Sequence, residues 1–183
     1  MTMNAKKAAA RPAAGEYASF YEPYISLVKS DDIIGTLEAQ GLQTARFLAA
    51  RSERDGNFRY APDKWSVKEV VGHLSDSERI FAYRALRIAR GDGTALSGFE
   101  QDDYVRGGKF GERTLADLAE EFSLVRAASV ALFKSLGNDA WQQRGVANKN
   151  EVTVRALAYI IAGHELHHRR ILDERYFPAI PRA

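Results

Sequence analysis

Proline is almost absent from the body of this chain, and this absence constrains the fold more than any other sequence feature. Between residues 24 and 177 the only proline is Pro62. Over the same stretch apolar residues recur at the steps of three and four that are typical of amphipathic helices, and strand-like alternation is absent. Because proline breaks the interior of a helix, this stretch has room for several long helices. The pattern therefore predicts an all-α protein.

Four segments carry this helical periodicity. They span roughly residues 31–52, 67–90, 115–136 and 154–176. Asp31 and Asp32 are suited to begin the first segment, because carboxylates accept the free N–H groups at a helix start. Ser66 and Glu69 match a capping box at the start of the second segment. Helices of about 20 residues extend about 30 Å, and their apolar stripes can be buried only against one another. A four-helix bundle is the simplest fold that does so.

The chain is expected to hold one domain and one tail. We expect residues 26–178 to form a single bundle domain and residues 1–25 to form a flexible, polar N-terminal tail. The connection between the second and third helices, residues 91–113, is long for a bundle and combines polar with aromatic residues. A connection of that length usually crosses the end of a bundle or lines a site. It is therefore a candidate for the rim of a pocket.

Composition narrows the classes of function. The 183 residues include no cysteine, which excludes a disulfide framework, a thiolate zinc site, an iron–sulfur cluster and a cysteine nucleophile. The absence of cysteine also fits a cytoplasmic protein. A formal net charge of +2 gives no basic surface of the kind that nucleic-acid-binding proteins need, and no apolar run is long enough to cross a membrane. These properties favour a small-molecule substrate as the partner, rather than a nucleic acid or a membrane.

The four histidines are unevenly placed, since His73 stands alone and the other three lie within residues 164–168. His164 and His168 occupy seam positions of the fourth helix where Leu or Ile would be expected, one helical turn apart. Burying neutral imidazoles costs free energy unless their nitrogens find partners, and a divalent metal satisfies both at once. His73 can join them if the second and fourth helices are neighbours. Three neutral ligands leave coordination positions open for water or substrate, as in catalytic sites.

The segment HELHH also matches the HExxH pattern of zinc metalloproteases, in which the glutamate, here Glu165, is the general base. Only 15 residues follow His168, too few for the usual third ligand and its supporting helix. No sheet edge that could bind a peptide is evident. Glu165 is therefore a weak candidate for a catalytic base, and the alternative is a charged residue on the flank of the helix.

Other polar residues are candidates for supporting the histidines. Asp76 lies one helical turn after His73 and could orient its ring through a hydrogen bond, although a solvated carboxylate is an equal alternative. His167 points away from His168 on the helix, which suggests a supporting or surface role, and it is also a substitute ligand. The arginines of the second helix predict a mostly solvated face, or an intermolecular one, and not a phosphate site: Arg79, Arg84, Arg87 and Arg90.

Three stretches of the sequence together resemble a known family. The second helix contains WSVKEVVGHLSDSERIFAYRALRIARGD, the long connection contains FEQDDYV, and the fourth helix contains AGHELHHRRIL. Over about residues 30–175 the chain resembles the DinB/YfiT-like superfamily of metalloenzymes. The resemblance implies a four-helix bundle of up-down-down-up type, a divalent metal held by His73, His164 and His168, and a homodimer. Better-understood members are thiol-dependent S-transferases that use bacillithiol, mycothiol or glutathione, or related isomerases.

We therefore predict a divalent-metal-binding protein whose metal, zinc or nickel, activates a water or a low-molecular-weight thiol for attack on an electrophilic substrate. This chemistry would make it a metal-dependent S-transferase or hydrolase. Because the chain has no cysteine, any reacting thiol would have to arrive with a cosubstrate. Two alternatives stay open. One is a non-catalytic metal-binding or stress-response scaffold, favoured if side chains block the open metal positions. The other is a metal-free helical interaction module.

Overall fold

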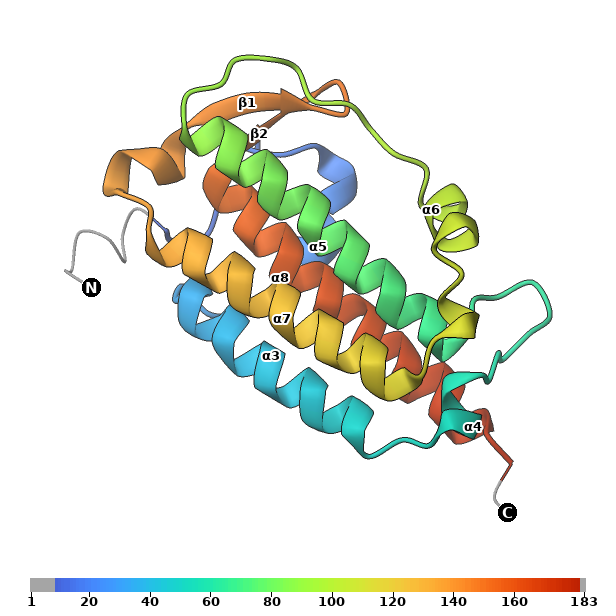
Figure 1. The fold of residues 1–183 in the computed structure, drawn as a ribbon. Coiled ribbons are helices and arrows are strands. Elements are labelled where there is room, and N and C mark those ends of the chain that lie inside the picture. Colours follow the sequence, from blue (N-terminus) through green and yellow to red (C-terminus); the bar gives the residue numbers. More distant parts are fainter. Residues whose placement is uncertain (1–8, 182–183) are drawn as a thin grey trace.

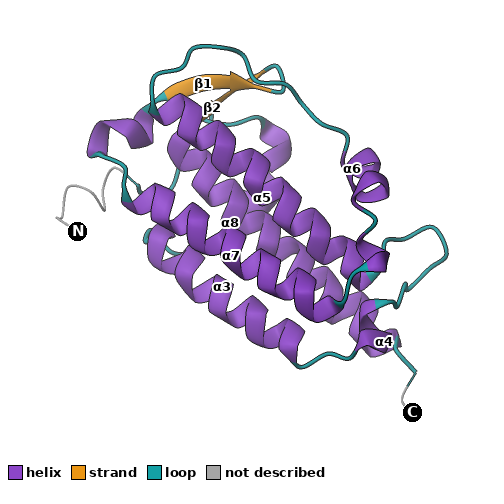
Figure 2. Cartoon of the chain, in the orientation of Figure 1, coloured by secondary structure: helices purple, strands orange, loops and turns teal. Residues whose placement is uncertain are grey.

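Four long helices form a bundle in the computed structural model, which describes residues 9–181 (Figure 1). They are α3 (Ile33–Ala49), α5 (Val67–Ala89), α7 (Leu115–Lys134) and α8 (Val154–Ile171). Figure 2 shows that helices dominate the described chain. All four lie within the segments that the periodicity predicts, which confirms the four-helix bundle. No helix in the described residues combines the length and apolarity that crossing a bilayer requires.

Side-chain caps determine where these helices begin. Asp32 accepts a hydrogen bond at 3.1 Å from an amide in the first turn of α3. Ser66 and Glu69 form the predicted capping box of α5: the Ser66 hydroxyl accepts from the Glu69 amide at 3.2 Å, and the Glu69 carboxylate accepts from the Ser66 amide at 2.6 Å. Thr153 caps α8 in the same way as Asp32 caps α3, at 3.1 Å. Each cap satisfies an amide that has no partner within its helix.

The first part of α8 is buried on almost all sides. Residues 154–165 are buried except for the partly exposed Arg155. Within the bundle α8 packs against α5 and α3, and α2 (Glu22–Ile25) covers a further side. This close approach of α2 requires a glycine at Gly163, because an added Cβ would lie 2.1 Å from the carbonyl oxygen of Tyr24. The apolar run of α8 therefore reflects its central position in the fold.

Part of the segment 9–25 packs against the bundle, in contrast to the flexible tail expected over residues 1–25. Residues 1–8 lie outside the described part of the chain. Within the rest of that range, Ala9 and Ile25 are only 3% and 1% exposed. Parts of the segment before residue 26 are therefore buried in the described fold. These segments are too short for hydrophobic periodicity to reveal them.

A buried glutamate anchors this N-terminal segment to the start of α8. Glu16 accepts hydrogen bonds from the Thr153 hydroxyl at 2.9 Å and from Nε of Arg155 at 2.6 Å. Burial acts to raise the pKa of Glu16, but these hydrogen bonds and the charge of Arg155 lower it overall. A short 3-10 helix, η1 (Ser19–Tyr21), then leads into α2. The anchor therefore places α2 beside α8.

A two-stranded antiparallel hairpin, which the periodicity does not predict, precedes α8. Its strands are β1 (Arg144–Ala147) and β2 (Asn150–Thr153). Asn148 and Lys149 form the turn, with φ of 50° and 63°. A two-residue turn with both φ angles positive matches the twist of a tight hairpin. Strands of this length give too little alternation to be recognised in a sequence.

The long connection between α5 and α7 runs over the hairpin and then returns along α5 (Figure 1). Leu96 donates to the Val146 carbonyl at 2.9 Å and accepts from the Asn148 amide at 2.9 Å, which attaches the connection to the hairpin. The connection then forms α6 (Gln101–Gly108) and η2 (Phe110–Glu112), both of which pack against α5. Its path agrees with the expectation that a connection of this length lines a site.

Short helical segments complete the described chain. They are α4 (Glu53–Gly56), η3 (Asn138–Gln142), the π-helical η4 (Leu172–Tyr176) and η5 (Phe177–Ala179). The fourth predicted helix thus reaches Tyr176, but its last part is π-helical instead of α-helical. Pro178 lies in η5, where proline is tolerated because the first turn of a helix needs no amide donor.

Candidate metal centre

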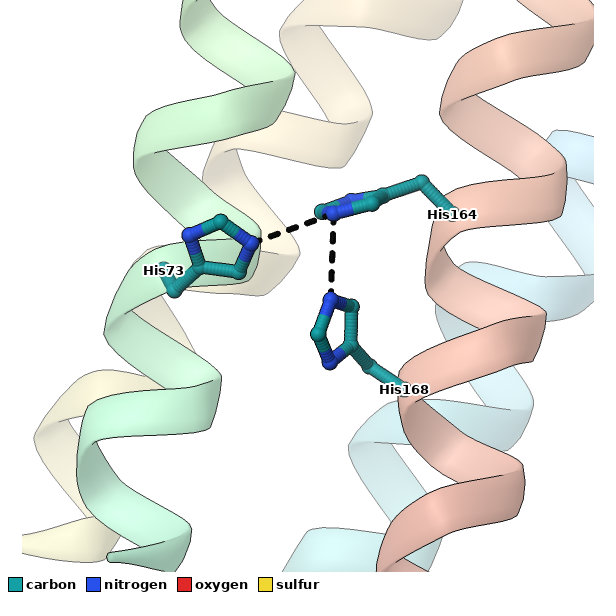
Figure 3. Close-up of side chains that lie close together, drawn as sticks. All are labelled: His73, His164 and His168. Atoms are coloured by element: carbon teal, nitrogen blue, oxygen red, sulfur yellow. Dashed lines mark hydrogen bonds between the residues drawn. The ribbon is translucent and has the colours of Figure 1, made fainter. Parts of the chain in front are cut away.

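Three histidines from two neighbouring helices point toward one another (Figure 3). His73 projects from α5, and His164 and His168 project from successive turns of α8. Nε2 of His164 lies 3.1 Å from Nε2 of His73 and 3.1 Å from Nε2 of His168. The ligand atoms of these three residues, here called the histidine trio, all lie within 4.8 Å of one another, and residues 9–181 contain no second group of this kind. The packing of α5 on α8 brings the three predicted histidines together.

The histidine trio is enclosed because its members occupy positions that face the neighbouring helix. His73 and His164 are 3% and 7% exposed, and His168 is partly buried. The Trp65 ring lies 4.8 Å from the His73 ring, and the Tyr24 ring lies 5.4 Å from the His164 ring, both between centroids. The i,i+4 spacing on α8 places two imidazoles on one face of that helix. Aromatic side chains therefore limit the access of water to the trio.

The nitrogens of the histidine trio cannot all be satisfied by one another. A neutral imidazole has one N–H donor and one acceptor nitrogen, and here three Nε2 atoms converge. Buried polar atoms in such a cluster need a further partner. A divalent cation accepts all three lone pairs, and nitrogen ligands of tetrahedral zinc are separated by about 3.3 Å. The observed separations of 3.1 Å fit a metal of this kind.

Burial keeps the histidine trio neutral. It lowers the pKa of His73 from 6.5 to about 4, and the nearby Asp102 carboxylate opposes this shift. Burial also lowers the pKa of His164 and of His168 well below 6.5, and repulsion from the neighbouring histidines adds to the effect. Metal binding requires the neutral form of imidazole. At neutral pH all three rings are therefore in the protonation state that a metal ligand needs.

A cavity of about 290 Å³ opens beside the histidine trio. His73 and His164 line it, together with Ser77 and Phe81 of α5 and Tyr24 of α2. The Ser77 hydroxyl lies 3.4 Å from Nδ1 of His73, where it can orient the ring. Ser77 has no predicted role, although its position as a polar residue in the apolar seam, one turn after His73, could have indicated a contact with that histidine. A small molecule in this cavity would meet two of the three histidines.

Glu165 is buried between helices, whereas its expected alternative role was a charged residue on the flank of the helix. It is 1% exposed. Its carboxylate accepts a hydrogen bond from Arg126 of α7 at 2.9 Å and another from the Thr44 hydroxyl of α3. Arg126 also binds Glu78 of α5, with two contacts of 2.8 Å. Through these contacts Glu165 joins neighbouring helices. Each oxygen of its carboxylate already has a hydrogen-bond partner, which does not favour a role as a catalytic base.

The two residues predicted to support the histidines have other partners. Asp76 pairs with Arg79 at 3.5 Å, and burial raises the pKa of its carboxyl. The His167 ring lies 5.1 Å from the rings of Tyr24 and His168, on the edge of the site. Within the described chain, neither Asp76 nor His167 forms a hydrogen bond with the histidine trio. A supporting role for them stays a prediction.

Arg84 departs from the solvated arginine face that the sequence predicts. It is 3% exposed and lines the same cavity as His73 and His164. Arg79 and Arg87, by contrast, are partly exposed on α5. Eleven residues separate Arg84 from His73, so the two lie on one face of the helix to within about 20°. This shared face was the signal that could have identified Arg84.

The fold and the histidine trio define an all-α bundle protein with a buried group of side chains of the kind that binds metal ions. The sequence model of the DinB superfamily matches residues 36–172, which is most of the chain. The chain therefore belongs to the DinB superfamily, and the resemblance seen in its motifs is confirmed.

A solved structure shares this fold. The chain aligns with YfiT from Bacillus subtilis, described as "a probable metal-dependent hydrolase with an unusual four-helix bundle topology", at 16% sequence identity and a TM-score of 0.71. The alignment covers 79% of this chain and 83% of YfiT. At this identity the likeness establishes the common bundle fold. A comparison with curated proteins found no match.

Proposed function

We propose that this protein is an enzyme whose histidine trio binds one divalent metal ion. The convergence of three buried, neutral imidazole nitrogens beside a cavity carries the proposal. Burying these nitrogens without a shared partner would cost free energy, and a metal removes that cost. Three protein ligands also leave coordination positions open, which is typical of catalytic metal sites and not of structural ones.

A divalent metal in this position would supply Lewis-acid chemistry and a nucleophile that is active at neutral pH. The residues of the chain hold and shield the site. The histidine trio provides neutral ligands, and Ser77 orients the ring of His73. Trp65 and Tyr24 cover the trio with aromatic rings, which keeps bulk water from part of the site. The cavity provides the space in which a small-molecule substrate meets His73 and His164.

Water is the nucleophile that we propose first. The description of YfiT as a probable metal-dependent hydrolase favours water, since the two chains share the bundle fold. A thiol is the second candidate, because the family resemblance includes thiol-dependent S-transferases. This chain has no cysteine, so that thiol would belong to a cosubstrate. A non-catalytic scaffold is the less favoured alternative, because the cavity leaves His73 and His164 accessible from one side.

Elemental analysis of the untagged protein, purified after growth with added zinc and nickel, tests the metal. We expect about one divalent ion per chain, as three ligands on one chain imply. His168→Ala should lose the ion because only two ligands remain, whereas His167→Ala, at the adjacent position outside the trio, should retain it. A wild-type protein without metal would contradict the proposal, and so would full metal occupancy in His168→Ala.

Assays with two electrophiles then distinguish the nucleophiles. We expect metal-loaded protein to hydrolyse 4-nitrophenyl acetate without any thiol, and His168→Ala to lose this activity. Turnover of 1-chloro-2,4-dinitrobenzene that depends on added glutathione or another small thiol would instead identify an S-transferase. A metal-loaded protein that is inert toward both would favour the scaffold. The homodimer and the choice of zinc or nickel stay predictions, which light scattering and the elemental analysis measure.

A further inference from the structure

Arg84 is a buried cation for which the described chain provides no carboxylate. Its side chain is 3% exposed. Its Nη2 donates to the carbonyl oxygen of Ser97 at 2.7 Å, and its guanidinium also interacts with the Tyr21 hydroxyl. It forms no ion pair with any residue in the described part of the protein. Burying a charge is costly unless an opposite charge compensates it. No carboxylate of the described residues therefore compensates this charge, and an added anion would do so.

Three other arginines near Arg84 have carboxylate partners. Arg79 pairs with Glu121 at 2.6 Å, and Arg87 pairs with Asp92. Arg126, which is as deeply buried as Arg84, pairs with two glutamates. These three cations are thus compensated, although Arg79 and Arg87 are less buried and need it less. Arg84 has no such partner among the described residues, and it lines the cavity of the histidine trio.

The position of Arg84 suits a ligand that also reaches the histidine trio. Its Cα lies about 16 Å beyond that of His73 along α5, and long helical side chains lean back toward the N-terminus of their helix. The Phe81 ring stands between the two groups, 5.8 Å from Cζ of Arg84 and 6.0 Å from the His164 ring centroid. A ligand that contacts both ends must therefore carry its anionic group several bonds from its reacting centre.

The walls between these two ends combine aromatic rings with polar side chains. Cζ of Arg84 lies 6.0 Å from the Phe99 ring, and the Tyr21 ring lies 6.1 Å from the Phe81 ring; all these residues line the cavity. The aromatic rings among them suit an apolar or aromatic ligand body. Glu100 also lines the cavity, but it is exposed and forms no ion pair with Arg84.

The loop that carries Ser97 is held in place by the hairpin. Leu96 is hydrogen-bonded to Val146 and Asn148. Gly98 packs so closely on the Asn148 side chain that an added Cβ would lie 2.3 Å from Oδ1. The carbonyl of Ser97 is therefore preorganised, and it holds the guanidinium of Arg84 at the cavity before any ligand arrives.

We propose that Arg84 binds the anionic group of the substrate, and that this substrate is a small organic acid with an apolar or aromatic body. The inference rests on the proposed function, since the reacting centre would lie at the histidine trio. A guanidinium is suited to this task because its N–H groups match two oxygens of a carboxylate or a related anion. Arg84 would therefore determine which substrates are accepted.

A pair of probes that differ only in charge tests Arg84. The anion is 2-phenylethanesulfonate, chosen because sulfonates coordinate metals poorly, and the neutral match is methyl 2-phenylethyl sulfone. By calorimetry on metal-loaded protein, we expect the sulfonate to bind at least about tenfold more tightly. Arg84→Met should remove this preference without changing the affinity for the sulfone. Arg87→Met, one turn further along α5 and paired with Asp92, should leave both affinities unchanged.

Equal affinities of wild-type protein for the two probes would overturn the inference, and so would an unchanged sulfonate affinity in Arg84→Met. Should Arg84→Met fail to fold, Arg84→Lys keeps the charge but not the planar fork, and sulfonate binding should weaken about threefold or more; an unchanged affinity there would also overturn the inference. Metal content measured on the same samples separates the two proposals. A sulfonate preference that persists in chelator-treated protein supports Arg84 even if the metal-dependent function fails.

Discussion

Two buried polar clusters join the same helices, and they differ in whether the protein satisfies them internally. In the charged cluster, Arg126 of α7 pairs with Glu78 of α5 at 2.8 Å and with Glu165 of α8 at 2.9 Å. Each of these three side chains is 3% exposed or less. The histidine trio also joins α5 to α8, but its nitrogens are all of one chemical kind. The charged cluster is closed, meaning that its charges compensate one another, whereas the histidine trio is open, meaning that it needs a further partner.

This difference shows how one helix pair provides both support and a reactive site. Opposite charges in the charged cluster satisfy one another, so that cluster stabilises the packing without needing an outside partner. The imidazoles of the trio can satisfy one another only in part, so they stay available to a cation. Glu165 directly follows His164 in the chain. The closed cluster therefore holds in place the turn of α8 that carries part of the open one.

The largest effect is expected from breaking the closed cluster. Arg126→Met leaves the carboxylates of Glu78 and Glu165 buried without their cation, and it should lower the free energy of unfolding by about 3–5 kcal/mol. Urea denaturation measures this loss. Replacing all three residues by apolar ones, as Glu78→Leu, Arg126→Met and Glu165→Leu, should recover much of the stability because no charge is then left unpaired. A free energy of unfolding of Arg126→Met within about 1 kcal/mol of the wild-type value would contradict the interpretation that these charges compensate one another.

Acid should destabilise the open cluster in metal-free protein. The pKa of His73 is about 4 in the folded chain against 6.5 ordinarily, so the unfolded chain takes up the proton first as the pH falls. Stability from this residue is therefore complete above pH 6.5 and is lost progressively down to about pH 4. In this range the free energy of unfolding falls by about 1.4 kcal/mol per pH unit for each such histidine.

Denaturation at several pH values measures this slope, and a variant isolates the contribution of His73. His73→Gln should reduce the slope between pH 6.5 and pH 5 by about 1.4 kcal/mol per pH unit. The carboxylates contribute mainly below this window. A slope that is identical in wild type and His73→Gln would show that His73 is not held neutral by burial.

The smallest effect is expected from the residue that orients one histidine. Ser77→Ala removes the hydroxyl 3.4 Å from Nδ1 of His73 and should weaken metal binding by about tenfold, while the fold is retained. Competition with a chromophoric chelator measures the affinity. Ser75→Ala is the matched control, because Ser75 is equally buried on α5 but bonds the Val71 carbonyl. Equal metal affinities of Ser77→Ala and Ser75→Ala would show that Ser77 does not support metal binding by His73.

Much of the bundle and the centre of the site could be predicted from local pattern. The four helices follow from apolar periodicity and caps such as Ser66 with Glu69, because both signals are contained within one segment. The trio follows from histidines in seam positions, which must face another helix. The hairpin and the packed N-terminal segment could not be predicted, because each is only a few residues long and depends on contacts distant in sequence. Glu16, for example, is held by Thr153 and Arg155.

By itself, the sequence determined which face of each helix is buried and which side chains that face presents, including His73, His164 and His168. Only the tertiary structure decided what each buried group meets. It paired Glu165 with Arg126 and left Arg84 facing a cavity, although the helical pattern favoured a helix-flank position for Glu165 and a mostly solvated face for the arginines of α5. The physical reason is that periodicity encodes the burial of a residue, whereas charge compensation depends on which neighbouring helix or loop supplies the partner.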